Sequence, residues 1–206
     1  MLEFTKFPSI KRFSRDIIIT EKLDGTNAQI YIELRAAVPQ EEIDSGGFPF
    51  MSLEKDGLDY VMLAGSRSRW LGKGKDDNFG FGEWVGNNAK ELLELGPGKH
   101  FGEWWGKGIQ RGYGLDKKKF SLFNVTRWYN FDTHTNICPS CCDVVPTMYK
   151  GPLTEESIYL SLEALKVGGS SAAKGFMNPE GIVIFHTAAN ILFKKTLEND
   201  EKGKAE

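Results

Sequence analysis

The stretch DIIITEKLDGTNAQIYIEL, residues 16–34, decides the fold of this chain of 206 residues. Its first part holds three consecutive isoleucines, which predict a buried strand over 16–20. A polar turn follows at 21–26, and residues 27–34 then alternate between apolar and polar side chains. Such alternation is typical of a half-buried strand. Two strands joined by a short polar turn indicate an antiparallel sheet.

The rest of the chain predicts two helices and several short strands. One helix is expected over 80–95, before the stop Gly-Pro-Gly at 96–98, and a second over 154–166 with Thr154 as its N-cap. Further strands are expected at 60–64, 120–125, 181–185 and 191–194, and a surface excursion at 39–57. We therefore expect one α+β domain over 1–206, rich in antiparallel sheet, with 197–206 as a frayed tail.

Composition excludes several classes of protein. Lys and Arg total 26 against 28 Asp and Glu, so the net charge of −2 offers no general attraction to phosphate. The sequence has no apolar run of membrane-spanning length and no signal-peptide core at its start. We expect a cytoplasmic protein without a membrane partner.

The three cysteines lie close together in the sequence. With a histidine upstream they form the cluster His134, Cys138, Cys141 and Cys142, which could hold a zinc ion. Structural zinc sites usually take ligand pairs from two separate loops, however, and two adjacent cysteines must point in opposite directions. Free thiols in a turn, kept reduced, are therefore favoured over a zinc site.

The turn after the first strand carries a candidate nucleophile, Lys22, within KLDGTN. By itself this string is weak, because a β-turn with an exposed lysine has the same pattern. Five further elements follow it in order. They are SRSRW at 66–70, FGEWWG at 101–106, FSLFNV at 120–125, PEGIVI at 179–184 and LFKK at 192–195.

This ordered set resembles the motifs of the covalent nucleotidyltransferases, the superfamily of DNA ligases, RNA ligases and mRNA capping enzymes. The phrases DDNFGFGEW at 76–84 and GEWWGKGIQRGYG at 102–114 are most similar to the adenylation domain of nick-sealing RNA ligases. The resemblance implies an ATP-grasp-like ligase adenylation fold. Because the chain ends soon after the last motif, we expect a minimal ligase without an OB-fold domain. This small motif set is also typical of bacteriophage or bacterial enzymes.

The resemblance implies a role for each motif residue. Lys22 would attack the α-phosphate of ATP and hold AMP covalently, Lys194 would supply positive charge, and Glu180 would bind Mg²⁺ or Mn²⁺. The residues expected to bind the nucleotide are Glu21, Asp24, Gly25, Asn27, Arg67, Glu103, Phe123, Lys194 and Lys195. Among them Glu21 would lie near the adenine edge, Glu103 would accept a ribose hydroxyl, and Phe123 would stack on adenine.

Two features of the last motif bear on the phosphate contacts. Adjacent residues on a strand point to opposite faces, so only one of Lys194 and Lys195 can face the nucleotide. The family pattern commonly has two lysines separated by one residue, and this chain has Thr196 at the second of those positions. The second phosphate contact therefore has no obvious residue.

Nucleic-acid contacts are expected from local cation clusters. The first choice is the run around Trp70, with Arg69, Lys73 and Lys75, and the second choice is Lys107 and Arg111. The partner implied is RNA, or an RNA/DNA nicked duplex with a 5′-phosphate, and the protein is expected to act as a monomer.

Together these features predict an ATP-dependent RNA ligase that joins 3′-hydroxyl and 5′-phosphate ends through lysyl-AMP and an AMP-capped 5′ end. One alternative is a capping-type guanylyltransferase, which would use GTP. A second is a non-catalytic module that binds nucleic-acid ends on the same fold. The intact set of Lys22, Glu103, Glu180 and Lys194 favours an enzyme over such a module.

Overall fold

The computed structural model describes residues 3–41, 51–72, 77–198 and 200. The chain divides into two compact units. Unit 1 combines Met1–Lys22 with Pro146–Glu206, and unit 2 is Leu23–Val145. The boundary at Lys22 and Leu23 cuts through the KLDGTN motif, so each unit carries part of the predicted site.

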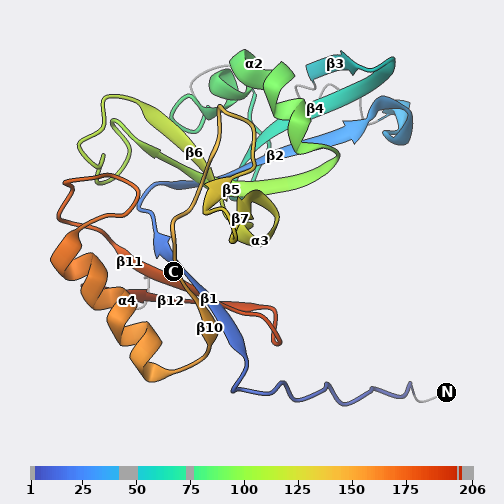
Figure 1. The fold of residues 1–206 in the computed structure, drawn as a ribbon. Helices are drawn as coiled ribbons and strands as arrows, with labels where there is room; N and C mark the ends of the chain where they lie inside the picture. The colour runs from blue at the N-terminus through green and yellow to red at the C-terminus, as the bar shows by residue number, and fades with distance from the viewer. Residues whose placement is uncertain (1–2, 42–50, 73–76, 199, 201–206) are drawn as a thin grey trace. The chain divides into compact units, whose positions relative to one another are not determined.

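Unit 1 is a four-stranded antiparallel sheet with one helix on it (Figure 1). Its strands, in sheet order, are β10 (Thr147–Pro152), β1 (Asp16–Lys22), β11 (Gly181–His186) and β12 (Ile191–Thr196). Helix α4 (Glu155–Gly168) connects β10 to the loop before β11. Thr154 caps this helix as predicted, because its side-chain oxygen accepts a hydrogen bond from the Ser157 backbone N–H at 3.0 Å.

The core of unit 1 lies between α4 and one face of the sheet. Its buried members are Ile17 and Ile19 of β1, Ile182 and Ile184 of β11, and Leu165 of α4. Strand β1 is central, paired with β10 on one side and β11 on the other. A strand with neighbours on both sides and buried side chains is a rigid base for Lys22 at its end.

Unit 2 is built on a six-stranded sheet. In sheet order the strands are β3 (Met51–Lys55), β4 (Leu58–Ser66), β2 (Thr26–Leu34), β5 (Gly98–Gly106), β6 (Lys118–Leu122) and β9 (Asp143–Val144). The remaining elements are η1 (Arg35–Ala37), α2 (Phe81–Leu92), η2 (Leu93–Leu95), α3 (Val125–Trp128) and the hairpin of β7 (Tyr129–Asn130) with β8 (Thr135–Asn136). Within the described strands, β6 and β9 are the pair that runs parallel.

The core of unit 2 is aromatic. Four rings pack with centroids 5.1–5.7 Å apart: Phe81 and Trp84 of α2, Trp104 of β5 and Phe120 of β6. Each such contact adds to the free energy gained by burying the ring area. This cluster fixes β5 and β6 against α2, and these two strands carry Glu103 and lead into Phe123.

The α+β fold rich in antiparallel sheet is confirmed, as are the two opening strands and both helices. No OB-fold domain lies within the described residues. The expectation of an irregular excursion over 39–57 was wrong in part, because 51–55 form β3. Strands β5, β7, β8 and β10 were not predicted. No helix in the described part of the chain is long and apolar enough to cross a membrane.

Candidate active site

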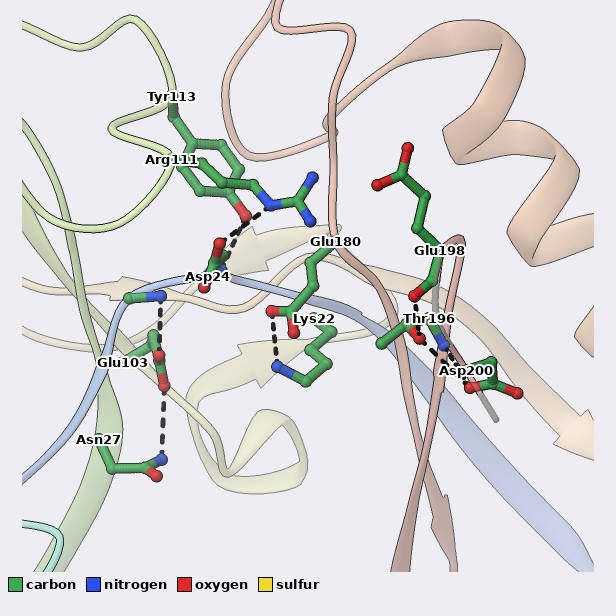
Figure 2. Close-up of polar contacts among 11 residues, drawn as sticks. Lys22, Asp24, Asn27, Glu103, Arg111, Tyr113, Glu180, Thr196, Glu198 and Asp200 are labelled. Carbon is green, nitrogen blue, oxygen red and sulfur yellow. Dashed lines mark hydrogen bonds and ion pairs between the residues drawn. The ribbon is translucent and has the colours of Figure 1, made fainter. Parts of the chain in front are cut away.

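The predicted nucleophile and the predicted metal-binding acid meet in unit 1. Lys22 is the last residue of β1, and Glu180 directly precedes β11, which pairs with β1. The Lys22 Nζ lies 2.6 Å from Glu180 Oε2. A dashed line marks this contact in Figure 2. Their side chains are 24% and 19% exposed, so the pair is partly shielded and still open to a ligand.

Strand register decides which lysine of LFKK shares the face of Lys22. Directly opposite residues of an antiparallel sheet point to the same face. Lys194 pairs with Val183, which pairs with Thr20, and Thr20 is two residues before Lys22. Lys194 therefore lies on the face of Lys22, as the resemblance implies.

Lys195 lies on the opposite face of this sheet. Its partner is Ile182, a core residue under α4, and Ile182 pairs with Glu21. The Lys195 Nζ forms an ion pair with Asp200 Oδ2 at 3.1 Å. This placement separates Lys195 from Lys22, so the expectation that Lys195 binds the nucleotide has no support from the register.

Thr196 replaces the second lysine of the family pattern and shares the face of Lys22. The row across the sheet runs from Lys22 through Gly181 to Thr196. The Thr196 hydroxyl donates to the Glu198 carbonyl at 2.8 Å, and its backbone N–H donates to Asp200 Oδ1 at 2.8 Å (Figure 2). The hydroxyl oxygen keeps acceptor capacity but brings no positive charge to this row.

A glycine separates Lys22 from Thr196 because no side chain fits there. Gly181 has φ +152°, and a Cβ at this position would lie 2.2 Å from the Lys195 carbonyl oxygen. Only a glycine lets β11 and β12 approach this closely in the row of Lys22. The glycine of PEGIVI is thus explained by β11–β12 packing.

The Glu21 carboxylate is buried and binds the loop after α4, a contact that we call the Glu21 clamp. Its side chain points to the α4 face of β1 and is 1% exposed. Its oxygens accept hydrogen bonds from the Ser170 hydroxyl at 2.6 Å and from the backbone N–H groups of Ser171 at 2.8 Å and Ala172 at 3.0 Å. Burial raises the pKa of this carboxyl against the lowering effect of those hydrogen bonds.

The Glu21 side chain was expected near adenine, and its contacts within unit 1 are different. Both oxygens hold the loop that follows α4, and this loop leads to Glu180. The three loop residues were not singled out in the sequence, because they lie about 150 positions from Glu21 and carry no motif.

In unit 2, Glu103 organises the rest of the KLDGTN turn. One carboxylate oxygen accepts the Gly25 backbone N–H at 3.0 Å, and the other accepts the Asn27 side-chain amide at 3.4 Å (Figure 2). Gly25 must be a glycine, because a Cβ would lie 2.4 Å from the Trp104 carbonyl oxygen. The structure thus brings together three of the predicted nucleotide-binding residues.

Asp24 is held by two residues of the loop after β5. Its backbone N–H donates to the Tyr113 hydroxyl at 2.8 Å, and its carboxylate accepts from Arg111 Nε at 2.9 Å (Figure 2). Tyr113 is buried and packs edge-on against Trp105 at 4.9 Å between centroids. The sequence suggested Arg111 as a phosphate contact, and Tyr113 was missed because a lone tyrosine in a glycine-rich loop carries no signal.

Phe123 is 39% exposed, whereas its neighbours Phe120 and Leu122 on β6 are buried. The exposed ring fits the predicted stacking role better than a core role. Its backbone N–H donates to the Phe101 carbonyl at 3.0 Å, which fixes the end of β6 beside β5. The ring is therefore presented from a rigid strand end.

The cationic candidates of unit 2 lie on turns. Arg67 and Arg69 are exposed in the turn after β4, which closes through Ser66 N–H to the Arg69 carbonyl at 2.8 Å. Lys107 is exposed just after β5. The predictions for Lys73 and Lys75 lie outside the described residues. The structure does not gather these cations into one described cluster with Arg111.

The cysteine cluster of unit 2 has internal contacts. Cys138 donates to the Cys142 carbonyl at 3.4 Å, and the sulfurs of Cys141 and Cys142 lie 3.9 Å apart. The His134 ring contacts the Tyr129 hydroxyl at 3.3 Å. All three cysteines are free thiols, and among the described residues no group of three or more His, Cys, Asp and Glu is placed to hold a metal ion. The zinc hypothesis gains no support.

A divalent cation of the Mg²⁺ class fits the chemistry of Glu180. Such an ion needs hard oxygen ligands and is often bound by one or two carboxylates together with substrate phosphates and water. Glu180 supplies one partly exposed carboxylate beside Lys22. The donor set therefore fits a cation that arrives with a nucleotide.

Comparison with known proteins gives the family. A sequence model described as RNA ligase matches residues 15–196, which include all of unit 2, most of unit 1 and every motif quoted above. The chain belongs to the RNA ligase family. A comparison with curated protein sequences gives no significant match.

Solved structures of the Naegleria gruberi RNA ligase share the fold of this RNA ligase family member. A glutamate-to-alanine mutant with ATP and Mn has a TM-score of 0.53 at 17% identity, covering 93% of this chain and 52% of that chain. A lysine-to-alanine mutant with ATP and Mn has a TM-score of 0.52 at 17% identity, covering 87% and 48%. The chain thus spans about half the length of those proteins.

Proposed function

We propose that this RNA ligase family member is an ATP-dependent RNA ligase that joins a 3′-hydroxyl to a 5′-phosphate through a covalent lysyl-AMP. The observation that carries the proposal is the 2.6 Å contact between Lys22 Nζ and Glu180 Oε2, with Lys194 on the same sheet face. A binding module needs no amine held beside a carboxylate and a second cation. The arrangement suits an amine that attacks a phosphate.

The chemistry proceeds in three transfers. Lys22 Nζ loses a proton and attacks the α-phosphorus of ATP, so that an N–P bond forms and pyrophosphate leaves. An oxygen of the RNA 5′-phosphate then attacks the same phosphorus and breaks the N–P bond. Finally the 3′-hydroxyl loses a proton and attacks the phosphorus of that 5′-phosphate, which closes the strand and releases AMP.

Each residue of unit 1 has a defined task in this scheme. Lys194 places positive charge on the face where phosphate charge develops. Glu180 holds Lys22 in place in the free protein and would bind the divalent cation when nucleotide is present. Bound Mg²⁺ or Mn²⁺ would neutralise phosphate charge and polarise the reacting group.

The residues of unit 2 are proposed to contact the nucleoside. Phe123 offers an exposed ring for adenine, and stacking of a base on an aromatic ring is worth about 1–3 kcal/mol. Glu103 holds Gly25 and Asn27, and its carboxylate is proposed to accept a ribose hydroxyl when nucleotide binds. Arg67 is proposed to contact the ribose or a phosphate.

The substrate is proposed to be a nicked duplex with RNA at the 3′-hydroxyl and a 5′-phosphate across the break, sealed by a monomer. Discrimination between RNA and DNA depends on contacts to the 2′-hydroxyl. Arg69 and Lys107 are the described candidates for backbone contacts, because both are exposed cations on turns.

The test is transfer of label from α-labelled ATP or GTP to the protein with Mg²⁺ or Mn²⁺, measured after denaturation. We expect label from ATP, none on Lys22→Ala, and full labelling of the control Lys166→Ala on exposed α4. Lys194→Ala should label at least tenfold more slowly than Lys195→Ala, because only Lys194 shares the face of Lys22. Equal rates for these two variants would contradict the register argument.

Sealing is then measured on matched nicked duplexes with RNA or DNA at the 3′-hydroxyl. Sealing of the RNA-ended nick supports the proposal. Label from GTP in preference to ATP would indicate a capping-type guanylyltransferase, and the absence of any label would favour a module that binds nucleic-acid ends without turnover.

A further inference from the structure

The segment before β1 combines an apolar row with a cationic row. Four large apolar side chains recur at every third position, namely Phe4, Phe7, Ile10 and Phe13. They are 88%, 77%, 87% and 75% exposed. Soluble proteins expose single apolar residues often, but a regular series of large ones indicates an interaction site.

The spacing of three selects an extended chain. Side chains at this interval drift round an α-helix and alternate between the two faces of a strand, whereas they line one edge of a polyproline II helix. Pro8 favours that conformation. Residues 3–12 form neither helix nor strand, and Figure 1 shows them as an extended trace leading to β1.

A second edge of the same ribbon is cationic. Lys6, Arg12 and Arg15 also recur at multiples of three, one position before the apolar series, and all three are exposed. Lys11 adds a fourth cation, and Glu3 is the acid of the segment. The segment is therefore basic in a chain whose net charge is −2.

We propose that residues 3–15 are an arm that binds single-stranded nucleic acid, with bases stacked on the phenylalanine edge and phosphates neutralised by the cationic edge. This inference rests on the proposed function, which supplies an RNA substrate, and it concerns a single strand that continues beyond the paired nick. Aromatic platforms beside cations are the general means of binding single strands without sequence readout. At about 3.1 Å per residue the apolar edge extends over roughly 28 Å, enough for several nucleotides.

The arm is anchored at its end nearest the sheet. The Phe13 carbonyl contacts the His186 ring nitrogen at 2.7 Å, and the Arg15 carbonyl accepts the Leu153 backbone N–H at 3.0 Å. These contacts fix the end of the arm to β11 and to the loop after β10. Residues 3–12 extend beyond this anchor, so an RNA strand bound there is held by unit 1.

The experiment uses the full chain and a 5′-phosphorylated single-stranded RNA of about 12 nucleotides, within the usual site sizes for such proteins. Fluorescence anisotropy gives the affinity over a range of salt concentrations. The apolar variant combines Phe4→Ala, Phe7→Ala and Phe13→Ala. The cationic variant combines Lys6→Gln, Arg12→Gln and Arg15→Gln, and the control combines Tyr159→Ala with Val167→Ala, both exposed on α4.

The apolar variant should bind about tenfold or more weakly with an unchanged salt slope, because stacking carries no counterion release. The cationic variant should lose about 2 from the slope of log affinity against log salt, since each neutralised phosphate on a single strand contributes about 0.7. The control should bind as wild type. Loading of the protein with AMP from labelled ATP should be the same in all four proteins.

Three outcomes would overturn the proposal that residues 3–15 bind RNA. RNA affinity and salt slope that match wild type in both arm variants would exclude it. If the arm variants weakened binding of the full chain to anionic phospholipid vesicles and left RNA binding unchanged, the arm would have a membrane partner instead. Lower melting temperatures with slower AMP loading in both variants would show that the arm stabilises the fold. A wild-type protein that takes no AMP contradicts the proposed function alone, because RNA binding is measured separately.

Discussion

Removal of the Glu21 carboxylate should destabilise the protein far more than removal of a surface acid. Glu21→Ala removes an acceptor from three donors at a position that is 1% exposed, the Ser170 hydroxyl and the Ser171 and Ala172 backbone N–H groups. The Ala172 N–H also donates to Ser170 Oγ at 3.2 Å, so it keeps one acceptor. Hydrogen bonds to a charged group contribute about 1.5–3 kcal/mol each, and they are not additive. We expect a loss of about 3–5 kcal/mol in the free energy of unfolding.

Thermal and urea unfolding followed by circular dichroism measure this loss. For a chain of this size it corresponds to a fall of about 10 °C in melting temperature. The matched control is Glu163→Ala on α4, whose 3.6 Å pair with Lys166 is exposed and should contribute less than about 0.5 kcal/mol. A Glu21→Ala protein that melts within about 1 °C of wild type would refute the clamp.

A second variant separates the clamp from a direct contact with adenine. Glu21→Gln keeps the shape but turns an amide N–H₂ toward at least one donor, so unfolding free energy should fall while the KM for ATP stays constant. An unchanged melting temperature with a raised KM would instead support the adenine contact suggested by the family resemblance.

The pH dependence of stability provides an independent check on Glu21. Because burial raises its pKa, the folded protein holds this proton more tightly than the unfolded chain does. Protonated Glu21 therefore stabilises the fold, and this contribution is complete below the ordinary pKa of 4.5. It is lost as the pH rises through the raised pKa of the folded protein. Glu21→Gln should flatten the stability curve in that window, and a steeper curve would contradict the assignment.

The remaining predictions concern backbone geometry and thiols. Gly181→Ala should lower the free energy of unfolding in urea by about 3 kcal/mol or more, since φ is +152° and the new Cβ would meet the Lys195 carbonyl oxygen. A loss below about 1 kcal/mol would show that β12 can move aside. Thr154→Ala should cost about 1 kcal/mol through loss of the α4 cap, measured the same way, with Thr154→Ser near wild type. Cys141 should be alkylated before Cys138 at pH 8, because the hydrogen bond from Cys142 lowers the pKa of Cys141. Burial raises the pKa of Cys138 to about 11. Peptide mass spectrometry after iodoacetamide treatment measures the order, and earlier alkylation of Cys138 would contradict this prediction.

Sequence patterns predicted the elements whose side chains repeat with a clear period. The isoleucines of β1 and the alternation of β2 reflect burial on known faces, and Thr154 marks the start of α4 by its capping chemistry. Strand β5 escaped prediction because GKHFGEWWG mixes glycines with adjacent buried rings and never alternates. Strand β10 holds a glycine and ends in proline, a composition tolerated because it is an edge strand.

The motifs located the candidate site, but they could not assign the contacts within it. Alternation required Lys194 and Lys195 to point to opposite faces, and only the pairing of β11 with β1 and β12 identifies Lys194 as the one on the face of Lys22. The motif position of Glu21 suggested adenine, whereas its hydrogen bonds depend on a loop about 150 residues away. Local pattern gives the residue type and its face, and long-range pairing decides its partner.

Glu21 and Glu180 show how local pattern and long-range pairing together build the site around Lys22. Glu21 and Lys22 are adjacent on β1, so their side chains must point to opposite faces of the sheet. On one face Glu21 holds the loop that leads into Glu180, and on the other Glu180 contacts the Lys22 ammonium at 2.6 Å. The buried Glu21 therefore positions the partly exposed Glu180 through a single loop, so substitution of Glu21 should slow the transfer of AMP to Lys22.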